Sequence, residues 1–200
     1  MDRQREAWES LYSGQARPWR GVADISWMDI SEGDRVLDLG CGNGKTSAAL
    51  MEKGAVVTGI DFSPSAVRSC MDQFGGKGTF LEADVRALPF PDGSFDKIVS
   101  VHVIEHVPAS DISKASEEIM RALREGGTLF LRCFAEGDMR SGGRKEDTRN
   151  GILYRYFTEE DIRSIFPSME IVSVERIEEP TRFGTVRCRL QAVLRKTRIT

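Results

Sequence analysis

An aspartate followed by three alternating glycines is the feature of this sequence best suited to binding chemistry. Asp38 lies inside a short apolar run, and Gly40, Gly42 and Gly44 follow it. Glycine has no Cβ and tolerates positive φ, so this turn can bring the backbone close to a ligand. Residues 45–51 have the pattern of a helix, whose first N–H groups would face the same cleft. The pattern predicts a ligand-binding turn between a buried strand and a helix.

Two phosphate-binding motifs come close to this turn without matching it. A dinucleotide-binding turn needs Gly-x-Gly-x-x-Gly, and here Lys45 occupies the place of the third glycine. A nucleoside-triphosphate loop needs Gly-x-x-x-x-Gly-Lys-Ser/Thr, but its first glycine falls on Leu39, and Asp38 would repel the phosphates. A carboxylate two residues before Gly-x-Gly-x-Gly therefore favours a ligand with a positive centre and no phosphate.

Two further carboxylates follow predicted strands. Asp61 ends the second apolar run, and Asp84 comes just after the third. The carboxyl ends of parallel strands meet at one edge of a sheet, where such sheets bind ligands. We therefore expect these acids to share a site with Asp38, rather than to act only as caps of turns.

Residues 102–106 spell His-x-x-Glu-His, which is a zinc motif when it lies on a helix and a third ligand is available. Here the motif begins at the end of a predicted strand, and Pro108 follows it closely. We therefore predict no metal site.

The elements that must position these groups alternate between strands and helices, which predicts a doubly wound parallel sheet. Residues 186–194 alternate apolar and polar side chains, as expected for an antiparallel strand with one wetter face. Residues 135–151 are predicted to form a long polar loop. Strands are expected at 35–39, 55–60, 79–81, 95–101, 128–134, 169–177 and 186–194, and helices near 8–12, at 45–51, 64–74 and 108–123, and from 158.

Composition places the chain among ordinary globular proteins. Its 200 residues carry a net charge of −3, which gives no argument for nucleic acid or an anionic membrane as partner. The four cysteines are far apart and form no Cys-x-x-Cys pair, so we expect free thiols in the reducing cytoplasm. We expect neither a signal peptide nor a membrane span, because no apolar run is long enough.

With these motifs in place, residues 36–44 resemble motif I of the class I S-adenosylmethionine (SAM)-dependent methyltransferases. The resemblance is closest to the type 11 subgroup of ubiquinone/menaquinone methyltransferase-like proteins, and it covers about residues 33–135. Asp61 takes the family's place after the second strand. Further matching segments are residues 83–85, 88–96, 103–107 and 123–127.

The resemblance implies an α/β, Rossmann-like fold. Its sheet would be doubly wound, seven-stranded and mostly parallel, with an antiparallel last strand and helices on both faces. We expect one domain over residues 1–200. Residues 1–32 would form N-terminal helices or a lid, 33–135 the cofactor-binding core, and 136–200 the variable acceptor region with the C-terminal strands.

The resemblance also implies a site for SAM, which leaves as S-adenosylhomocysteine. Asp38 would lie near its ammonium group, Asp61 would accept the ribose hydroxyls, and Asp84 would accept from the adenine amino group. The Trp19 loop could cover the cleft or could pin the N-terminal helix to the core. The expected cofactor-binding residues are Trp19, Asp38, Gly40, Cys41, Gly42, Asp61, Phe62, Ser63, Ala83, Asp84, Val85, Ser100, Val101 and His106.

The methyl acceptor and its chemistry are less constrained. An oxygen or nitrogen acceptor can need a base, and we expect His106 and Tyr154 in that role, with His102, Glu105 and Tyr156 as further candidates. A small-molecule acceptor is expected, while nucleic-acid or protein acceptors and the oligomeric state stay open. Basic residues in 135–151 suit an anionic acceptor, but also a solvated loop. The alternatives to a methyltransferase are a nicotinamide-dependent oxidoreductase and a non-catalytic cofactor-binding protein of the same fold.

Overall fold

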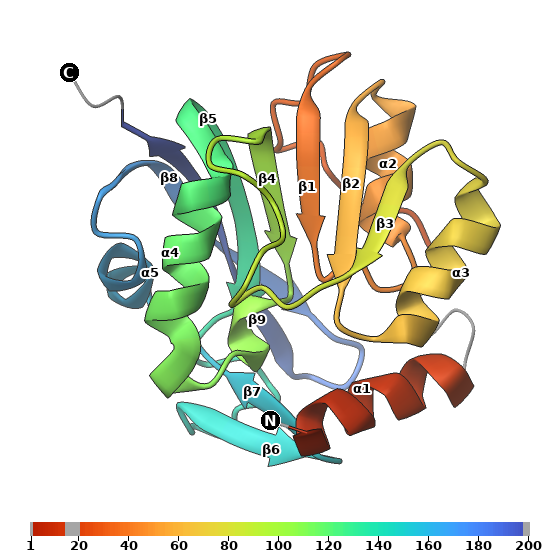
Figure 1. Cartoon of the computed structure of the whole chain (residues 1–200). Helices are drawn as coiled ribbons and strands as arrows, with labels where there is room; N and C mark the ends of the chain where they lie inside the picture. Colours follow the sequence, from red (N-terminus) through yellow and green to blue (C-terminus); the bar gives the residue numbers. More distant parts are fainter. Residues whose placement is uncertain (1, 15–20, 198–200) are drawn as a thin grey trace.

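A single sheet of seven strands organises the computed structural model, which describes residues 2–14 and 21–197 (Figure 1). Its strand order is β3-β2-β1-β4-β5-β9-β8. Strands β1 to β5 are parallel, and β9 is antiparallel to both of its neighbours, which confirms the predicted sheet. The strands are β1 (Arg35–Leu39), β2 (Val56–Asp61), β3 (Thr79–Glu82), β4 (Phe95–Val101), β5 (Leu123–Phe134), β8 (Met169–Pro180) and β9 (Val186–Lys196).

Apolar side chains on both faces of the sheet account for the two layers of helices. Successive residues of a strand point to opposite faces. Thus Val36 packs with Leu50 of α2, whereas Leu37 belongs to the core that contains Ile119 of α4 and Ile162 of α5. The helices are α1 (Asp2–Gly14), α2 (Lys45–Glu52), α3 (Pro64–Phe74), α4 (Ile112–Ala122) and α5 (Glu159–Ile165), with 3-10 turns η1 (Ile104–His106) and η2 (Ala109–Asp111).

Two helices begin where their capping residues predict. The side chain of Ser63 accepts from the N–H of Ala66, and Pro64 takes the first position of α3. Thr158 and Asp161 form a reciprocal capping box at the start of α5. The cap at Ser63 places α3 directly after the end of β2, beside the predicted site.

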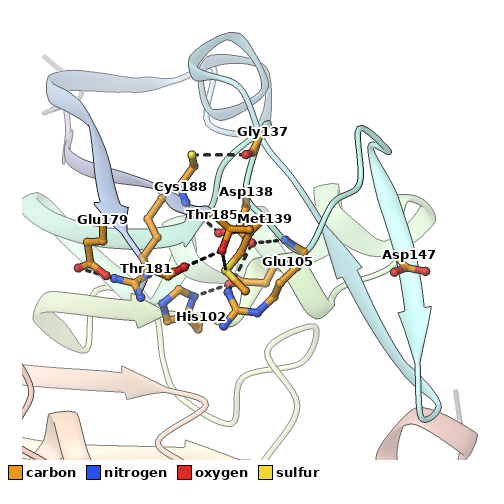
Figure 2. A network of polar contacts seen from close by, with 12 residues as sticks. His102, Glu105, Gly137, Asp138, Met139, Asp147, Glu179, Thr181, Thr185 and Cys188 are labelled. Atoms are coloured by element: carbon orange, nitrogen blue, oxygen red, sulfur yellow. Dashed lines mark hydrogen bonds and ion pairs between the residues drawn. The ribbon is translucent and has the colours of Figure 1, made fainter. Parts of the chain in front are cut away.

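The prediction of one long loop over residues 135–151 is wrong in its last part. Strand β6 (Glu146–Arg149) pairs with β7 (Ile152–Arg155) in a hairpin. Asn150 and Gly151 both have positive φ at its turn, and Asn-Gly is a strong hairpin signal that the polar composition obscured. The buried carboxylate of Asp138 accepts from the N–H of Cys188 at 2.8 Å, which ties this segment to β9 (Figure 2).

Two further boundaries differ from prediction. The helix expected over 108–123 begins only at Ile112, because the preceding residues form the turn η2. Strand β5 begins at Leu123 rather than at 128, and it pairs with β4 across an irregularity between Phe95 and Lys97. The two glycines of residues 126–127 therefore lie inside a strand instead of ending a helix.

Helix α1 lies across the end of the sheet toward which β1 to β4 point, close to β7 (Figure 1). Among the described residues, no helix combines the length and the apolar character that crossing a membrane requires. The four cysteines are free thiols and all are buried.

Candidate functional site

A cavity of about 220 Å³ opens at the carboxyl ends of β1 to β4. Helix α1 forms one wall, with Trp8 and Tyr12, and the glycine turn contributes Gly40. The other walls are residues 60–62 after β2, residues 83–86 after β3, and residues 102, 103 and 106–108 after β4. The strand ends that the sequence singled out therefore border one shared cavity.

The glycine turn is packed so tightly that its glycines cannot be replaced without a shift. Gly40 has φ of 58°, and a Cβ there would lie 2.7 Å from Cγ2 of Val103. Gly42 has φ of 53°, and a Cβ there would lie 2.5 Å from the hydroxyl of Tyr12. Both the backbone conformation and the close approach thus require glycine.

Asp38 lies beneath this turn and does not line the cavity. It is 2% exposed, and its carboxylate accepts from the hydroxyl of Ser47 at 2.5 Å. Burial raises the pKa of Asp38 to about 7; the bond from Ser47 opposes this shift, and the nearby charge of Asp61 adds to it. Asp38 is therefore about half ionised near neutral pH.

Asp61 lines the cavity and also holds the glycine turn in place. Its carboxylate accepts from the N–H of Gly42 at 3.0 Å and from the N–H of Ser63 at 2.9 Å. Burial raises the pKa of Asp61 to about 6 despite these two bonds. The side chain thus connects the turn after β1 with the start of α3.

Asp84 also lines the cavity, after the end of β3, and its carboxylate is negatively charged. Arg86 binds both of its oxygens, at 2.8 Å through Nε and 2.5 Å through Nη2, and also binds Asp111. Burial alone would raise the pKa of Asp84, but the hydrogen bonds and charge of Arg86 hold this pKa below its usual range. The charge therefore persists at neutral pH.

His106 borders the cavity with a ring fixed by the protein itself. Its Nδ1 lies 2.6 Å from the carbonyl oxygen of Leu153, so Nδ1 carries the proton. Burial lowers the pKa of His106, and the ring of Trp8 packs edge-on against it at 5.0 Å. This geometry favours a structural role for the His106 ring. Tyr154 lies 5.0 Å from the same ring but does not line the cavity.

Comparison with known proteins of similar sequence or fold identifies the family of this chain. Residues 37–131 match the family model described as a methyltransferase domain. The methyltransferase GfsG of Streptomyces halstedii is 33% identical over 144 residues, which cover 69% of this chain and 49% of that protein. A demethylmenaquinone methyltransferase of Thermus thermophilus is 39% identical over 121 residues, 54% of each chain. A SAM-dependent methyltransferase structure from Methanosarcina mazei matches with a TM-score of 0.75 and 26% identity, covering 89% of this chain and 99% of that one.

This chain belongs to the class I SAM-dependent methyltransferases. The predicted resemblance to the ubiquinone/menaquinone methyltransferase-like subgroup is confirmed. The methyltransferase chain spans about half the length of the curated relatives named above. Both relatives are methyltransferases, so these matches support neither the oxidoreductase nor the non-catalytic alternative.

The methyltransferase cavity brings together half of the residues expected to bind the cofactor. Gly40, Asp61 and His106 line it, together with Phe62 and residues 83–85. Of the others, Ser63 caps α3, and Trp19 lies outside the described residues. The expected residues that are described but do not line the cavity are Asp38, Cys41, Gly42, Ser63, Ser100 and Val101.

The wall formed by α1 is the part of the site that sequence reasoning missed. Trp8 and Tyr12 lie on the helix expected near residues 8–12, but nothing local indicates what these two side chains cover. Glu9 attaches the helix to α3 by accepting from the hydroxyl of Ser63 at 2.6 Å and from the N–H of Ser65 at 3.1 Å. Gln4 attaches it to the far side through the carbonyl of His106. These contacts join residues that are far apart in sequence, so no spacing rule predicts them.

Proposed function

We propose that this chain transfers a methyl group from SAM to a small molecule, with the donor held at the carboxyl ends of β1 to β4. The observation that carries the proposal is the cavity beside the glycine turn, with carboxylates at two successive strand ends. Gly40 lines the cavity at a point where a side chain cannot fit, so the turn brings bare backbone against the cavity. SAM supplies, when bound, a methyl group activated by a positively charged sulfur.

The hydrogen-bond acceptors in the cavity fit the adenosine part of SAM. Asp61 can accept the ribose hydroxyls, and Asp84 can accept from the adenine amino group beside the backbone of Val85. Phe62 and Ile60 provide apolar contact for the ring. A carboxylate offers about four acceptor positions, so Asp61 keeps acceptor capacity beside its backbone bonds from Gly42, Phe62 and Ser63.

The methionine part of SAM is expected over the glycine turn and the end of β4. We expect the carbonyls of Ser100 and Val101 and the buried carboxyl of Asp38 to favour an ammonium group there, directly or through water. The N–H groups of Cys41 and Gly42 already bond to Ile60 and Asp61, so the turn is expected to contact the donor mainly through Gly40.

A small acceptor is favoured by the relatives, whereas the charge pattern of the acceptor region gives no support to an anionic one. The Thermus relative acts on demethylmenaquinone, a small molecule. Within residues 136–155, Arg140 pairs with Asp138, and Arg144 and Arg149 pair with Asp147. These arginines therefore favour a structural role over an anion-binding one. The division into a cofactor core (33–135) and an acceptor region (136–200) is part of this proposal, and a cytoplasmic location stays a prediction from the free thiols.

Calorimetry with S-adenosylhomocysteine tests the donor site directly. We expect the wild type to bind it and Asp61→Asn to weaken binding at least about tenfold, since a bond from a hydroxyl to a carboxylate is lost. Asp92→Asn serves as the matched control, because this exposed carboxylate pairs with Arg121 away from the cavity. No heat with the wild type, or equal affinity of Asp61→Asn and the wild type, would contradict the proposal.

A further inference from the structure

His102 is held in an uncommon backbone conformation at the point where β4 ends. Its φ is 60°, and among the described residues only Asn150 shares positive φ without being glycine. Such a conformation is strained for histidine and persists where the surroundings hold it. The N–H of His102 bonds to the carbonyl of Arg132 at 2.8 Å, and its ring lies 4.5 Å from that of Phe134. These contacts hold His102, which is one of the residues that line the cavity.

A buried carboxylate lies behind the His102 ring. Oε1 of Glu105 lies 2.6 Å from Nδ1 of His102. Figure 2 labels both side chains within the same network of polar contacts. The Glu105 side chain is fully buried, and its Oε2 has no hydrogen-bond partner among the described residues. Burying a carboxylate with an unpaired oxygen costs free energy, and the hydrogen bond to the His102 ring offsets part of this cost.

This arrangement fixes which ring nitrogen of His102 is available. Because a carboxylate only accepts, Nδ1 of His102 carries a proton and donates it to Glu105. The other nitrogen, Nε2, keeps its lone pair. His106 lacks such a carboxylate on its ring, since its Nδ1 bonds to a carbonyl, and burial lowers its pKa. The titratable groups around the pair are His106 on η1, Cys133 on β5, Arg140 before β6 and Tyr154 on β7.

The strand order places His102 at the reactive end of the donor, an argument that rests on the proposed function. Adenine is assigned to the end of β3, ribose to the end of β2, and the methionine part to the turn after β1. The next strand in the sheet is β4, and His102 follows it directly. A Cβ on Gly40 would lie 2.7 Å from Cγ2 of Val103, so the segment that follows β4 lies beside the glycine turn.

We propose that His102, supported by Glu105, is the base that deprotonates the acceptor, and that the acceptor is a phenolic hydroxyl. The phenolic oxygen forms a bond to the methyl carbon while the carbon–sulfur bond breaks, and that electron pair stays on sulfur. The phenolic proton goes to Nε2 of His102, and Glu105 stabilises the resulting imidazolium. A phenol, with a pKa of about 10, is acidic enough for a histidine base, whereas an aliphatic alcohol is not. The aromatic side chains of Trp8 and Tyr12, which line the same cavity as His102, suit a flat acceptor.

Nitrogen NMR of histidine-labelled protein tests the base without turnover. With S-adenosylhomocysteine bound, we expect neutral His102 to carry its proton on Nδ1. A neutral ring protonated on Nε2 would overturn the proposal, because no lone pair would then face the acceptor. Failure of the wild type to bind S-adenosylhomocysteine would instead contradict the proposed function, so the two failures are distinguishable.

Turnover with two probes tests the same step in a second way. Catechol needs a base, whereas thiophenol is largely ionised at neutral pH and does not. We expect His102→Asn, which tolerates positive φ, to slow catechol methylation at least about 100-fold and thiophenol methylation only a few-fold. Glu105→Gln, a change to a positioning residue, should lower kcat for catechol while its KM stays close to the wild-type value.

Three results would count against the proposal in this assay. They are an equal loss with both probes in His102→Asn, an unchanged catechol rate in that variant, and a wild type that methylates thiophenol but not catechol. The thermal midpoint and S-adenosylhomocysteine affinity of each variant show whether it folds. If neither probe is methylated, the protonation site of the His102 ring decides.

Discussion

Replacement of Asp38 by asparagine should change how the stability of this protein depends on pH. The carboxyl of Asp38 is buried beneath the glycine turn, and burial raises its pKa to about 7. An unfolded aspartate has a pKa near 3.9. Between these two values the folded protein binds more protons at this position than the unfolded chain does. The wild type therefore loses stability from this group as the pH rises from 5 through 7.

The size of the effect follows from the pKa of about 7. Each pH unit in this window changes the free energy of unfolding by about 1.4 kcal/mol, so the group contributes roughly 3 kcal/mol between pH 5 and pH 8. Asparagine at position 38 keeps the shape and can still accept from Ser47, but it does not titrate. For a protein of this size the corresponding change is on the order of 6–12 °C in the midpoint of thermal unfolding.

Thermal or urea unfolding of wild type and Asp38→Asn at pH 5, 6, 7 and 8 measures this difference. We expect the variant to gain stability relative to the wild type as the pH rises. Asp61 titrates in both proteins, so its own contribution largely cancels. Asp96→Asn is the control, because Arg35 and Arg124 lower the pKa of Asp96 and its contribution is lost only below about pH 4.

The comparison with Asp96→Asn makes the result decisive. The difference in free energy of unfolding between Asp96→Asn and the wild type should stay constant between pH 5 and pH 8. If the difference in free energy of unfolding between Asp38→Asn and the wild type also stays constant over this range, the carboxyl of Asp38 is ionised throughout. The argument from burial would then be refuted.

Three further predictions concern the turn and the helix that covers it. Gly42→Ala should weaken S-adenosylhomocysteine binding at least about tenfold in calorimetry, because its Cβ would meet Tyr12 at 2.5 Å; unchanged affinity would show that the turn can adjust. Glu9→Ala should speed amide exchange in α1, since the bonds to the start of α3 are lost, and protection equal to wild type would contradict this attachment. Trp8→Phe should remove most of the fluorescence change on S-adenosylhomocysteine binding, whereas Trp27→Phe, outside the cavity, should retain it.

The sheet could be predicted from the sequence because each of its central strands is a short apolar run that the next helix separates from its neighbour. Topology then brought Asp61 and Asp84 to one edge without further information. The caps at Ser63 and Thr158 were recognisable because they depend on two or three neighbouring residues. Local patterns of this kind determine which elements form and in which order.

The remaining features depend on contacts between distant residues or on polar segments. Strand β6 is polar, so alternation could not reveal it, although Asn150 and Gly151 carried a turn signal. Glu9 bonds with Ser63, 54 residues away, and no spacing predicts such a pair. Glu105 reaches His102 because the turn η1 brings residues three apart to one side. The sequence shows both residues, but only the fold shows that one supports the other.

The antiparallel course of β9 has a practical consequence for handling this protein. Since β9 runs opposite to β1–β5, its last residue, Lys196, lies beside Met169, at the edge of the sheet remote from the cavity. An affinity tag or surface tether that follows β9 would therefore begin far from the cavity. A tag placed before α1 would begin close to it, because Gln4 and Arg5 line the cavity, so immobilised preparations should be attached through the C-terminal end.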